Sequence, residues 1–455
     1  MADYETLHRR HAEQYRALAQ RYIERIRWTP ERLRAERQQQ LRMLLRKAKD
    51  SSPWHRGRLS RIDPDQATEA DLQAIPPMTK EDLMRDFDAI LTDQRLSRQM
   101  VEAHIDHLEG DAYLLDEYHV VASGGSSGTR GVFVYDWDGW LKCALTMQKW
   151  RLQVHLVHLN LDLTAVRANI AGGKATHMTY AMAQTFGQGS SVVNVPATLP
   201  VSSIVERLNE LQPLMLSGYP SMISVLAREA QDGRLSIAPR TIWLGSEPVL
   251  PEMRVAIEAA WGNIVYNTYG TSEGASAGSC GHGQGLHLNE DSCIFEPLDK
   301  DAQPVRPGEH AVKMYVTPLF NHVQPLIRYE LTDEVTLTGE PCPCGSVLRR
   351  IGDIQGRADD VFMYPNGAAV HPLAFRSPLG RERNILEYQV RQTERGATIA
   401  IRAQGQVETE ALKRRLELEL AKLGLHNPEV TIEVVSQFDR QQTGKLKRFF
   451  PWPSV

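Results

Sequence analysis

Apolar and polar positions along the chain follow two different periods, which predicts a mixture of helices and strands. From Leu33 to Ala48 the apolar residues recur at helical spacing among Arg, Lys and Gln, as on a helix that covers a core. Thr79 stands just before Glu81 and Asp82, an arrangement typical of a helix N-terminus. We therefore expect one surface helix over 33–48 and a second helix that begins at Thr79.

The middle of the chain alternates short β-rich runs with helical patterns, which indicates a layered α/β domain. Strand and turn patterns replace the helical ones at 311–316 and around 326–335, and these predict a small β-rich subdomain. The alternating runs are Val132 to Tyr135, Val201 to Leu211, Leu214 to Leu216, Ser221 to Ala230, Thr241 to Leu244, and Glu252 to Trp261.

Beyond Gly356 the pattern becomes that of a small α+β domain. Residues 397–403 and 430–435 alternate like strands, and between them four leucines line one face of a helix that ends at Gly424. A charged segment from Gly352 to Asp360 precedes this region. We predict a large N-terminal domain over 1–355 and a small, mobile C-terminal domain over 356–455.

Size and charge narrow the class of protein. The chain has 455 residues, enough for more than one domain, and 52 basic against 56 acidic residues give a net charge of -4. That balance offers no broad attraction for nucleic acid or anionic lipid. The N-terminal residues have no apolar core of signal-peptide type, and no apolar run reaches the length of a membrane span. We therefore expect a soluble, cytoplasmic protein without nucleic-acid or membrane partners.

The first motif with a chemical reading is a run of small residues from Ser123 to Gly131, followed at once by the strand 132–135. Glycines let a backbone approach a phosphate chain closely, and hydroxyls and N–H groups can donate hydrogen bonds to its oxygens. The run lacks the lysine of a Walker loop, which argues against an ordinary P-loop enzyme. A phosphate cradle is the functional interpretation, and a solvent-exposed loop is the alternative.

Four further motifs follow in order. In Tyr266–Gly274 an aromatic residue can stack on a purine, and the carboxylate of Glu273 can hold magnesium. In Arg328–Asp333 the aspartate is suited to accept hydrogen bonds from ribose hydroxyls. Gly356–Asp360 and Thr443–Arg448 complete the set. Any one of them alone is more often an ordinary surface feature.

The five cysteines are too few for a disulfide scaffold in a chain of this length. Cys280, Cys342 and Cys344 lie near Gly, Pro and His, and with His287 they form a Cys3His set suited to zinc. His282 is the alternative histidine ligand. Four protein ligands leave no open coordination position, so the zinc would be structural. Unligated cysteines in a Gly-rich hairpin are the other interpretation.

Taken in this order, the motifs resemble the adenylate-forming superfamily, which includes acyl-coenzyme A synthetases, adenylation domains and luciferases. The resemblance spans nearly the whole chain. Within the superfamily the chain looks most like the phenylacetate-coenzyme A ligase branch. The segments that carry this closer likeness are Ile75–Leu83, Gly245–Pro248, Gly285–His287 with Glu290–Asp291, and Cys342–Gly345.

The resemblance implies roles for individual residues. Glu273 would bind magnesium, Lys445 would reach the substrate carboxylate and the α-phosphate, and Asp359 would be the hinge of the C-terminal domain. Negative charge builds up where a carboxylate attacks phosphorus, so a mobile lysine suits that place. The ATP and AMP site would be formed by Ser123, Gly124, Gly125, Ser126, Ser127, Gly128, Gly245, Ser246, Glu247, Pro248, Tyr269, Gly270, Thr271, Ser272, Asp333 and Arg357.

For the acyl pocket the resemblance implies His177, Tyr180 and Tyr219. The surrounding Tyr and Met residues favour a flat aromatic acid over a long fatty chain. Lys174 and His177 are suited to a polar ring substituent or a second carboxylate. A satisfied loop histidine and a solvated lysine are the alternative.

The function that the resemblance implies is ATP-dependent activation of a carboxylic acid, and three hypotheses follow from the motifs. In the first, an aryl or arylacetic acid and MgATP give an acyl-adenylate and pyrophosphate, and coenzyme A then takes the acyl group and releases AMP. In the second, the acceptor is a carrier-protein thiol, an amine or another nucleophile. The third is a non-catalytic nucleotide-binding zinc protein, disfavoured because Glu273, Asp333 and Lys445 are all present. A homodimer is left open.

Overall fold

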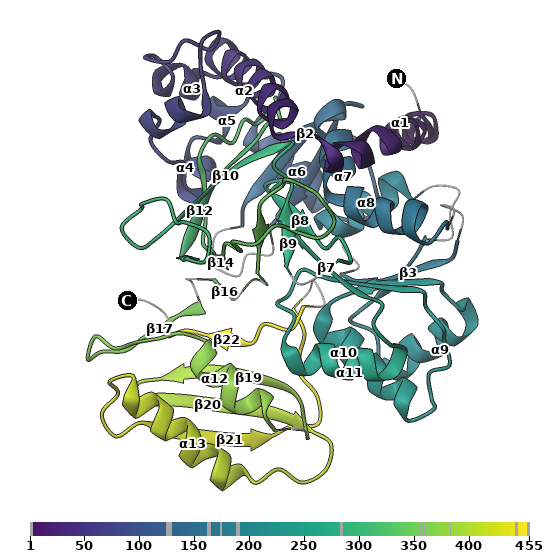
Figure 1. Ribbon diagram of the computed structural model, residues 1–455, viewed down its shortest axis with the longest axis vertical. Coiled ribbons are helices and arrows are strands. Elements are labelled where there is room, and N and C mark those ends of the chain that lie inside the picture. Colours follow the sequence, from purple (N-terminus) through teal and green to yellow (C-terminus); the bar gives the residue numbers. More distant parts are fainter. Residues whose placement is uncertain are drawn as a thin grey trace.

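The computed structural model describes residues 3–123, 130–161, 165–172, 175–187, 192–282, 285–352, 354, 356–357, 360–382, 384–441 and 445–452, with only the backbone of 356 and 357. Helices gather at the N-terminal end of the molecule, a large mixed sheet occupies its middle, and a smaller sheet with two helices lies at the opposite end (Figure 1). The α/β fold class predicted from the sequence is confirmed.

The large sheet has eight strands in the order β15-β9-β8-β7-β6-β5-β3-β4. Five of them are parallel, so their carboxyl ends meet at one edge, where sites usually form in such sheets. The parallel strands are β3 (Arg167–Ala171), β4 (Val192–Pro196), β5 (Met215–Gly218), β6 (Thr241–Gly245) and β7 (Val265–Gly270), and the antiparallel ones are β8 (Ser276–Gly278), β9 (Leu286–Leu288) and β15 (Arg350–Ile351).

Helices cover both faces of this sheet. One face carries a core of aliphatic side chains from α9, α10 and α11, and the other packs against α7 and α8 (Figure 1). The predicted patterns over 201–211, 221–230 and 252–261 are therefore helices. The bounds are α7 (Trp137–Leu152), α8 (Met178–Phe186), α9 (Val201–Leu211), α10 (Pro220–Gln231) and α11 (Pro251–Trp261), and a π-helical turn, η3 (Gln153–His158), continues α7.

The N-terminal helices confirm two predictions and add a helix that the pattern did not reveal. The predicted helix over 33–48 lies within α2, and Thr79 caps α4, its hydroxyl accepting a hydrogen bond from Asp82 N–H at 3.1 Å. The buried positions of α1 include His8 and His11, which hide its apolar period. The elements are α1 (Tyr4–Glu24), η1 (Arg25–Arg27), α2 (Pro30–Ser51), α3 (Pro53–Arg58), η2 (Glu69–Ala74), α4 (Lys80–Arg85), α5 (Phe87–Ile90) and α6 (Arg98–Asp106).

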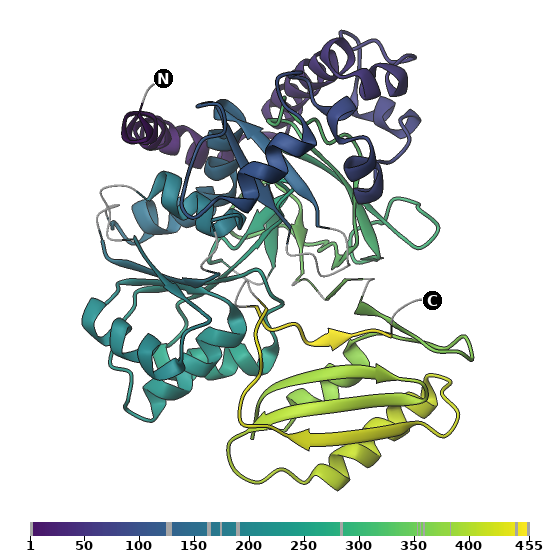
Figure 2. The ribbon, with the colours of Figure 1, turned by 180° about the vertical axis from the view of Figure 1, so that it is seen from behind.

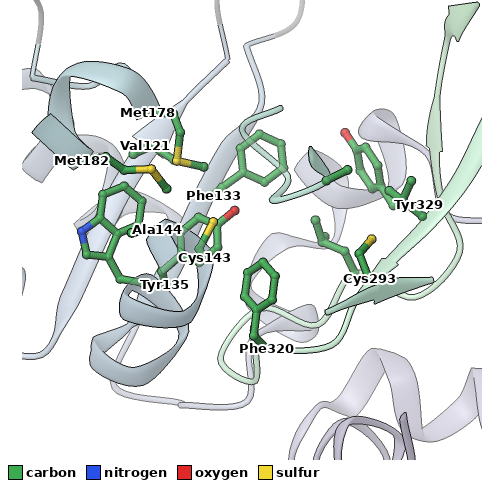
Figure 3. Packing of buried hydrophobic residues seen from close by; sticks show 14 of the residues in the cluster. Val121, Phe133, Tyr135, Cys143, Ala144, Met178, Met182, Cys293, Phe320 and Tyr329 are labelled. Atoms are coloured by element: carbon green, nitrogen blue, oxygen red, sulfur yellow. The ribbon is translucent and has the colours of Figure 1, made fainter. Parts of the chain in front are cut away.

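Three small sheets stand beside the large one and share its main core. Phe133, Tyr135 and Phe320 pack together in that core, close to the two methionines of α8 (Figure 3). The β-rich region predicted at 311–335 is confirmed by two of these sheets. The strands are β1 (Tyr118–Ala122) with β2 (Val132–Asp136), β10 (Cys293–Leu298) with β12 (Lys313–Pro318) and β13 (Tyr329–Leu331), and β11 (His310–Ala311) with β14 (Asp333–Thr336) and β16 (Gly356–Arg357).

The last part of the chain folds around a hydrophobic cluster of its own, to which Leu250, just before α11, and Met253, in α11, also belong. The predicted leucine-lined helix is α13, and the chain between β21 and β22 runs along the border with the large sheet (Figure 2). Among the described residues no helix is long and apolar enough to cross a membrane. The elements are β17 (Phe362–Met363), β18 (Ala369–Val370), α12 (Leu373–Gly380), β19 (Ile385–Thr393), β20 (Gly396–Ala403), α13 (Thr409–Lys422), β21 (Glu429–Val434) and β22 (Phe449–Phe450).

Candidate active site

Two cavities meet at the carboxyl ends of the parallel strands. The first, of about 280 Å³, lies against α7, α8 and strands β3, β5 and β6, and we call it the methionine cavity after Met147, Met178, Met182 and Met215. The second, of about 480 Å³, is the carboxylate cavity, whose acidic lining residues are Glu81, Glu247, Glu273, Glu330, Asp333 and Asp360. The residues that line both are Ser246, Thr268, Tyr269, Gly270, Thr271, Ser272 and Lys445.

The turn after β6 forms one wall of this junction. At Gly245 the strands approach so closely that an added Cβ would lie 2.7 Å from Thr268 Oγ1. Ser246 follows with φ of 66°, a left-handed conformation that costs energy for a residue with a Cβ. Such strain is found where a backbone must be aimed at a ligand. The predicted nucleotide segment 245–248 therefore lies at the junction, with Ser246 facing both cavities.

The loop after β7 contacts Tyr135 and Phe320, and its residue Glu273 lines the carboxylate cavity. Tyr135 donates a hydrogen bond to the backbone carbonyl of Ser272 at 2.7 Å. Gly274 has φ of 99°, and an added Cβ would lie 2.9 Å from the ring of Phe320, so no other residue fits there without movement. Glu273 is only 7% exposed but lines the cavity. Its carboxylate is thus placed by a rigid base, as a magnesium ligand requires.

Tyr269 and Asp333 approach one another across the carboxylate cavity. The phenol of Tyr269 donates to Asp333 Oδ2 at 3.0 Å, and both residues are buried apart from the faces that line the cavity. Asp333 also lies opposite Arg357 in the register of β14 and β16. Asp333, which was predicted to hold the ribose, and Arg357, which was predicted to contact nucleotide phosphate or ribose, are therefore neighbours on adjacent strands, although the side chain of Arg357 lies outside the described part.

Lys445 reaches the junction because the segment around it is attached to the large sheet. Leu446 N–H donates to Glu247 Oε1 at 2.9 Å, and Ser221 N–H donates to Glu247 Oε2 at 3.2 Å. Arg440 donates to Ser221 Oγ at 3.2 Å and forms an ion pair with Glu387 of β19. The sequence predicted Glu247 to line the adenine site. The structure shows that it also fastens the Lys445 segment.

The predicted phosphate loop begins at the wall of the carboxylate cavity. Ser123 lines that cavity, its N–H donates to Gly131 carbonyl at 2.8 Å, and Gly131 N–H donates to Ser123 Oγ at 2.8 Å. These two hydrogen bonds hold the two ends of the run next to each other. Gly124, Gly125, Ser126, Ser127 and Gly128 lie outside the described residues, as does the predicted hinge Asp359.

Of the three residues predicted for the acyl pocket, two line the methionine cavity and one does not. His177 and Tyr219 line the methionine cavity, and the hydroxyl of Tyr219 accepts a hydrogen bond from Gly172 N–H at 2.9 Å. Tyr180 is half-buried on α8 and lines neither cavity as described. Lys174 lies outside the described residues.

Sequence reasoning missed the basic residues at the far side of the methionine cavity, chiefly Arg151, His155 and Arg167. A signal was available, because Arg151 lies directly between the apolar residues Trp150 and Leu152. Charged residues are rarely placed among such neighbours without a function or a partner.

The predicted metal ligands converge. The ligand atoms of Cys280, His287, Cys342 and Cys344 all lie within 4.8 Å of one another. Cys280 Sγ is 3.5 Å from Cys342 Sγ, and Cys344 Sγ is 3.5 Å from His287 Nε2. His282, the alternative ligand, instead packs its ring edge-on against His158. The cluster ties the loop after β8 to the segment before β15.

The ring of His287 is oriented for metal binding through Nε2. Its Nδ1 lies 3.1 Å from the backbone carbonyl of Leu348, an acceptor that fixes the proton on Nδ1. Nε2 then turns a lone pair toward the three sulfurs. Histidines that bind a metal through one ring nitrogen commonly donate a hydrogen bond from the other. The residues present therefore fit a metal ion with tetrahedral coordination by three cysteines and one histidine.

No family model matches the chain, but curated proteins do. It is 26% identical over 363 residues to a phenylacetate-coenzyme A ligase of Thermus thermophilus, across 75% of this chain and 74% of that protein. Protein CapK of Staphylococcus aureus is 24% identical over 288 residues, which are 60% of this chain and 56% of CapK.

Solved structures extend the likeness to the fold. A 2-hydroxyisobutyryl-CoA ligase in its postadenylation state matches with a TM-score of 0.73 at 17% identity, over 94% of this chain and 92% of that one. The same ligase in its thioesterification state, with 2-HIB-AMP and CoA, matches with a TM-score of 0.58 at 17% identity, over 93% and 91%.

The fold is that of solved adenylate-forming ligases, and the sequence is similar to phenylacetate-coenzyme A ligases, in agreement with the resemblance that the motifs predicted.

Proposed function

We propose that this protein activates a carboxylic acid with ATP and transfers the acyl group to coenzyme A. One carboxylate oxygen attacks the α-phosphorus of ATP, and pyrophosphate leaves, which gives an acyl-adenylate. The thiol of coenzyme A then attacks the acyl carbon, and AMP leaves with the bonding electron pair. The observation that carries the proposal is that Lys445 lines both cavities at the point where they meet.

The residues that line each cavity indicate which substrate it would hold. The acid would occupy the methionine cavity, whose walls are largely apolar, and the nucleotide would occupy the carboxylate cavity. Asp333 would accept from ribose hydroxyls, with Tyr269 fixing its position. Glu273 would hold Mg²⁺ against the phosphates. Lys445 would place a positive charge between the reacting carboxylate and the α-phosphate, where negative charge develops.

We further propose that residues 356–455 form a domain that turns about Asp359 between the two half-reactions. The separate core of this part supports the division, and the few polar contacts around Glu247 are suited to break and re-form. We also propose that the acid is an aryl or arylacetic acid, that coenzyme A is the acceptor, and that the protein is cytoplasmic. A carrier-protein thiol, an amine or another nucleophile is the alternative acceptor.

Cys280, His287, Cys342 and Cys344 would hold one Zn²⁺. Four protein ligands close its coordination, so the ion would stabilise the fold and would take no part in the reaction. Its place between two loops of the large sheet supports that role.

Acid-dependent exchange of labelled pyrophosphate into ATP tests the proposal. We expect exchange with a panel of aryl and alkyl acids, and acyl-CoA with AMP when coenzyme A is added. Exchange without formation of acyl-CoA in the presence of coenzyme A would favour another acceptor. Absence of exchange with every acid, in protein that binds ATP, would refute the proposed activity.

A further inference from the structure

Helix α1 forms part of the wall of the methionine cavity. It packs beside α7 and α8 (Figure 1), and polar contacts fix it to both. His8 Nε2 lies 2.8 Å from the carbonyl oxygen of Gln184, near the end of α8. His11 Nε2 lies 3.0 Å from the carbonyl oxygen of Trp137, at the start of α7. The next buried position of α1, one turn on, is Tyr15, and this residue lines the cavity.

Tyr15 brings to the cavity a hydroxyl without a protein partner. The residue is only 7% exposed, and its ring stacks on the ring of Phe186 with centroids 4.9 Å apart. None of the described residues hydrogen-bonds to its hydroxyl. The hydroxyls of Tyr329 and Tyr388 are also unpartnered but fully enclosed, whereas the hydroxyl of Tyr15 keeps accessible surface. Because Tyr15 lines the cavity, a ligand there can reach this hydroxyl.

The hydroxyl of Tyr15 is uncharged and can both donate and accept. Burial raises the pKa of Tyr15 to about 12, although the charges of Arg167 and Arg151 act in the opposite direction. The phenol therefore keeps its proton at pH 7, donates one hydrogen bond and accepts others. A largely buried polar group without a partner costs free energy, and a hydrogen bond to a bound ligand would recover that cost.

A second uncharged polar group comes from α7. Between Cys143 and Trp150 every residue of α7 is buried except Met147 and Gln148, and both of these line the methionine cavity. The cavity therefore accounts for their exposure. The side-chain amide of Gln148 hydrogen-bonds to none of the described residues, and an amide offers both donors and an acceptor. The amide and the phenol of Tyr15 are together suited to a ligand group that itself both donates and accepts.

Tyr15 lies at the end of the cavity that is far from the junction. Helix α8 begins after the carboxyl end of β3 and ends before β4, whose Val192 lies opposite Arg167 at the start of β3. Phe186 ends this helix, eight residues after Met178, and at about 1.5 Å per residue the two are roughly 12 Å apart along the axis. Because Tyr15 stacks on Phe186, a group bound to its hydroxyl would be on the order of 10 Å from the reacting carboxylate.

We propose that the acid carries a hydroxyl at the end opposite its carboxylate, and that Tyr15 and Gln148 bind this hydroxyl at the far end of the methionine cavity. This rests on the proposed function, because it assumes that the carboxylate reacts beside Lys445. A hydroxyl donates one hydrogen bond and accepts others, so it can satisfy both side chains. An acid without the hydroxyl leaves both unpaired. Tyr15 and Gln148 are thus specificity-determining residues.

The space suits a hydroxyaryl acid with a short link between the ring and the carboxylate. A dry cavity of about 150 Å³ accommodates benzene, and about 280 Å³ leaves room for the link and the hydroxyl. The probes are 4-hydroxybenzoate, 4-hydroxyphenylacetate and 3-(4-hydroxyphenyl)propanoate, which place the hydroxyl at increasing distances from the carboxylate. Benzoate, phenylacetate and 3-phenylpropanoate lack only the hydroxyl, which makes them the matched control acids.

The test compares each hydroxy acid with its control acid in pyrophosphate exchange and in thermal shift. We expect wild type to prefer at least one hydroxy acid by about 10-fold or more in kcat/KM, the effect of one or two ordinary hydrogen bonds. Tyr15→Phe and Gln148→Leu should each reduce this preference by lowering kcat/KM for the hydroxy acid while leaving the control acid unchanged. Tyr22→Phe, the same change farther along α1 at a buried residue that lines neither cavity as described, should keep the preference.

Thermal shift separates the two claims because it does not require catalysis. Stabilisation of wild type by a hydroxy acid beyond its control acid, lost in Tyr15→Phe and without exchange for any acid, would support the hydroxyl site and refute the proposed activity. Exchange in which every hydroxy acid is used no better than its control acid would refute the hydroxyl site and leave the activity standing. A preference that survives in both Tyr15→Phe and Gln148→Leu would do the same.

Discussion

The carboxylate of Glu247 accepts a hydrogen bond from Leu446 N–H at 2.9 Å, across 199 positions of the chain. Leu446 follows Lys445 directly, so this contact fixes where the lysine ammonium can reach. Glu247 Oε2 accepts from Ser221 N–H at the start of α10 and thereby anchors the carboxylate to the large sheet. If Lys445 acts in adenylation as proposed, Glu247 would be a positioning residue for it.

Glu247→Ala should lower adenylation by about 10- to 100-fold, the loss expected for a hydrogen bond to a charged group. Thioester formation from chemically prepared acyl-adenylate should change little, because the contact must open for that step. The two rates are measured by pyrophosphate exchange and by AMP release with coenzyme A. Glu258→Ala, on α11 and lining neither cavity as described, is the matched control. Equal loss in both assays would show that Glu247 only supports the fold.

Tyr269→Phe should weaken ATP binding while leaving the acid site intact. The phenol hydroxyl donates to Asp333, and its removal leaves that carboxylate less well placed for ribose. We expect the KM for ATP to rise about 5- to 10-fold, the effect of one ordinary hydrogen bond, with little change in the KM for the acid. A selective rise in the KM for the acid would contradict the assignment of the carboxylate cavity to nucleotide.

The Cys3His cluster should hold about one zinc per chain in protein purified without chelator. Cys342→Ser and His287→Ala should lose the metal and lower the melting temperature, whereas His282→Ala should keep the metal, because its ring packs on His158 instead. Metal analysis and calorimetry measure both effects. Zinc retained by His287→Ala but lost by His282→Ala would reverse the ligand assignment.

The fully buried pair Lys149 and Asp291 gives a prediction on stability and pH. Burial alone would raise the pKa of Asp291, but the charges of Lys149 and Arg25 outweigh it and hold that pKa below its ordinary value. In wild type this carboxylate therefore contributes stability above its unfolded pKa of about 4, and the contribution is lost as pH falls through the lower folded pKa. Lys149→Met should cost roughly 3 kcal/mol at pH 7.

The pH dependence of the variant has the opposite sign. Without Lys149 the pKa of Asp291 rises above its unfolded value, so the cost should shrink as pH falls, by up to about 1.4 kcal/mol per pH unit. Denaturant unfolding at pH 7, 6 and 5 measures this trend. The double change with Asp291→Asn should recover much of the loss. A cost that is constant with pH would mean that the carboxylate is not the group left unpaired.

Features written in a few consecutive residues were predictable from the sequence. The Thr79 cap needs only Asp82 three positions later, and the Cys-x-Cys hairpin brings Cys342 and Cys344 together by itself. Periodicity likewise predicted α2 and α13, because their buried faces are almost purely aliphatic. Helix α1 was not predicted, because histidine and tyrosine occupy part of its buried face and obscure the apolar period.

Features that depend on distant parts of the chain could not be predicted. Glu247 looked like a nucleotide residue because its motif is local, whereas its bond to Leu446 exists only once the C-terminal part has docked. Arg151 lies on α7 and Arg167 on β3, and only the tertiary fold brings both to one cavity. Tyr180 is not among the described residues that line that cavity, whereas Met178, Thr179 and Met182 of the same helix do line it.

Lys445 is the proposed cation of the first half-reaction. We expect Lys445→Ala to cut acid-dependent pyrophosphate exchange by about two orders of magnitude, comparable to the loss of one preorganised donor. Lys447→Ala should lose less, because Lys447 lines the carboxylate cavity but not the junction.

The decisive measurement is therefore the ratio of two rates in Lys445→Ala: pyrophosphate exchange, and AMP release from ready-made acyl-adenylate with coenzyme A. We expect exchange to fall about 100-fold while AMP release stays within a few-fold of wild type, because the lysine is needed only where the two cavities meet during adenylation. Equal loss of both rates, or exchange at the wild-type level, would contradict the proposed role of Lys445.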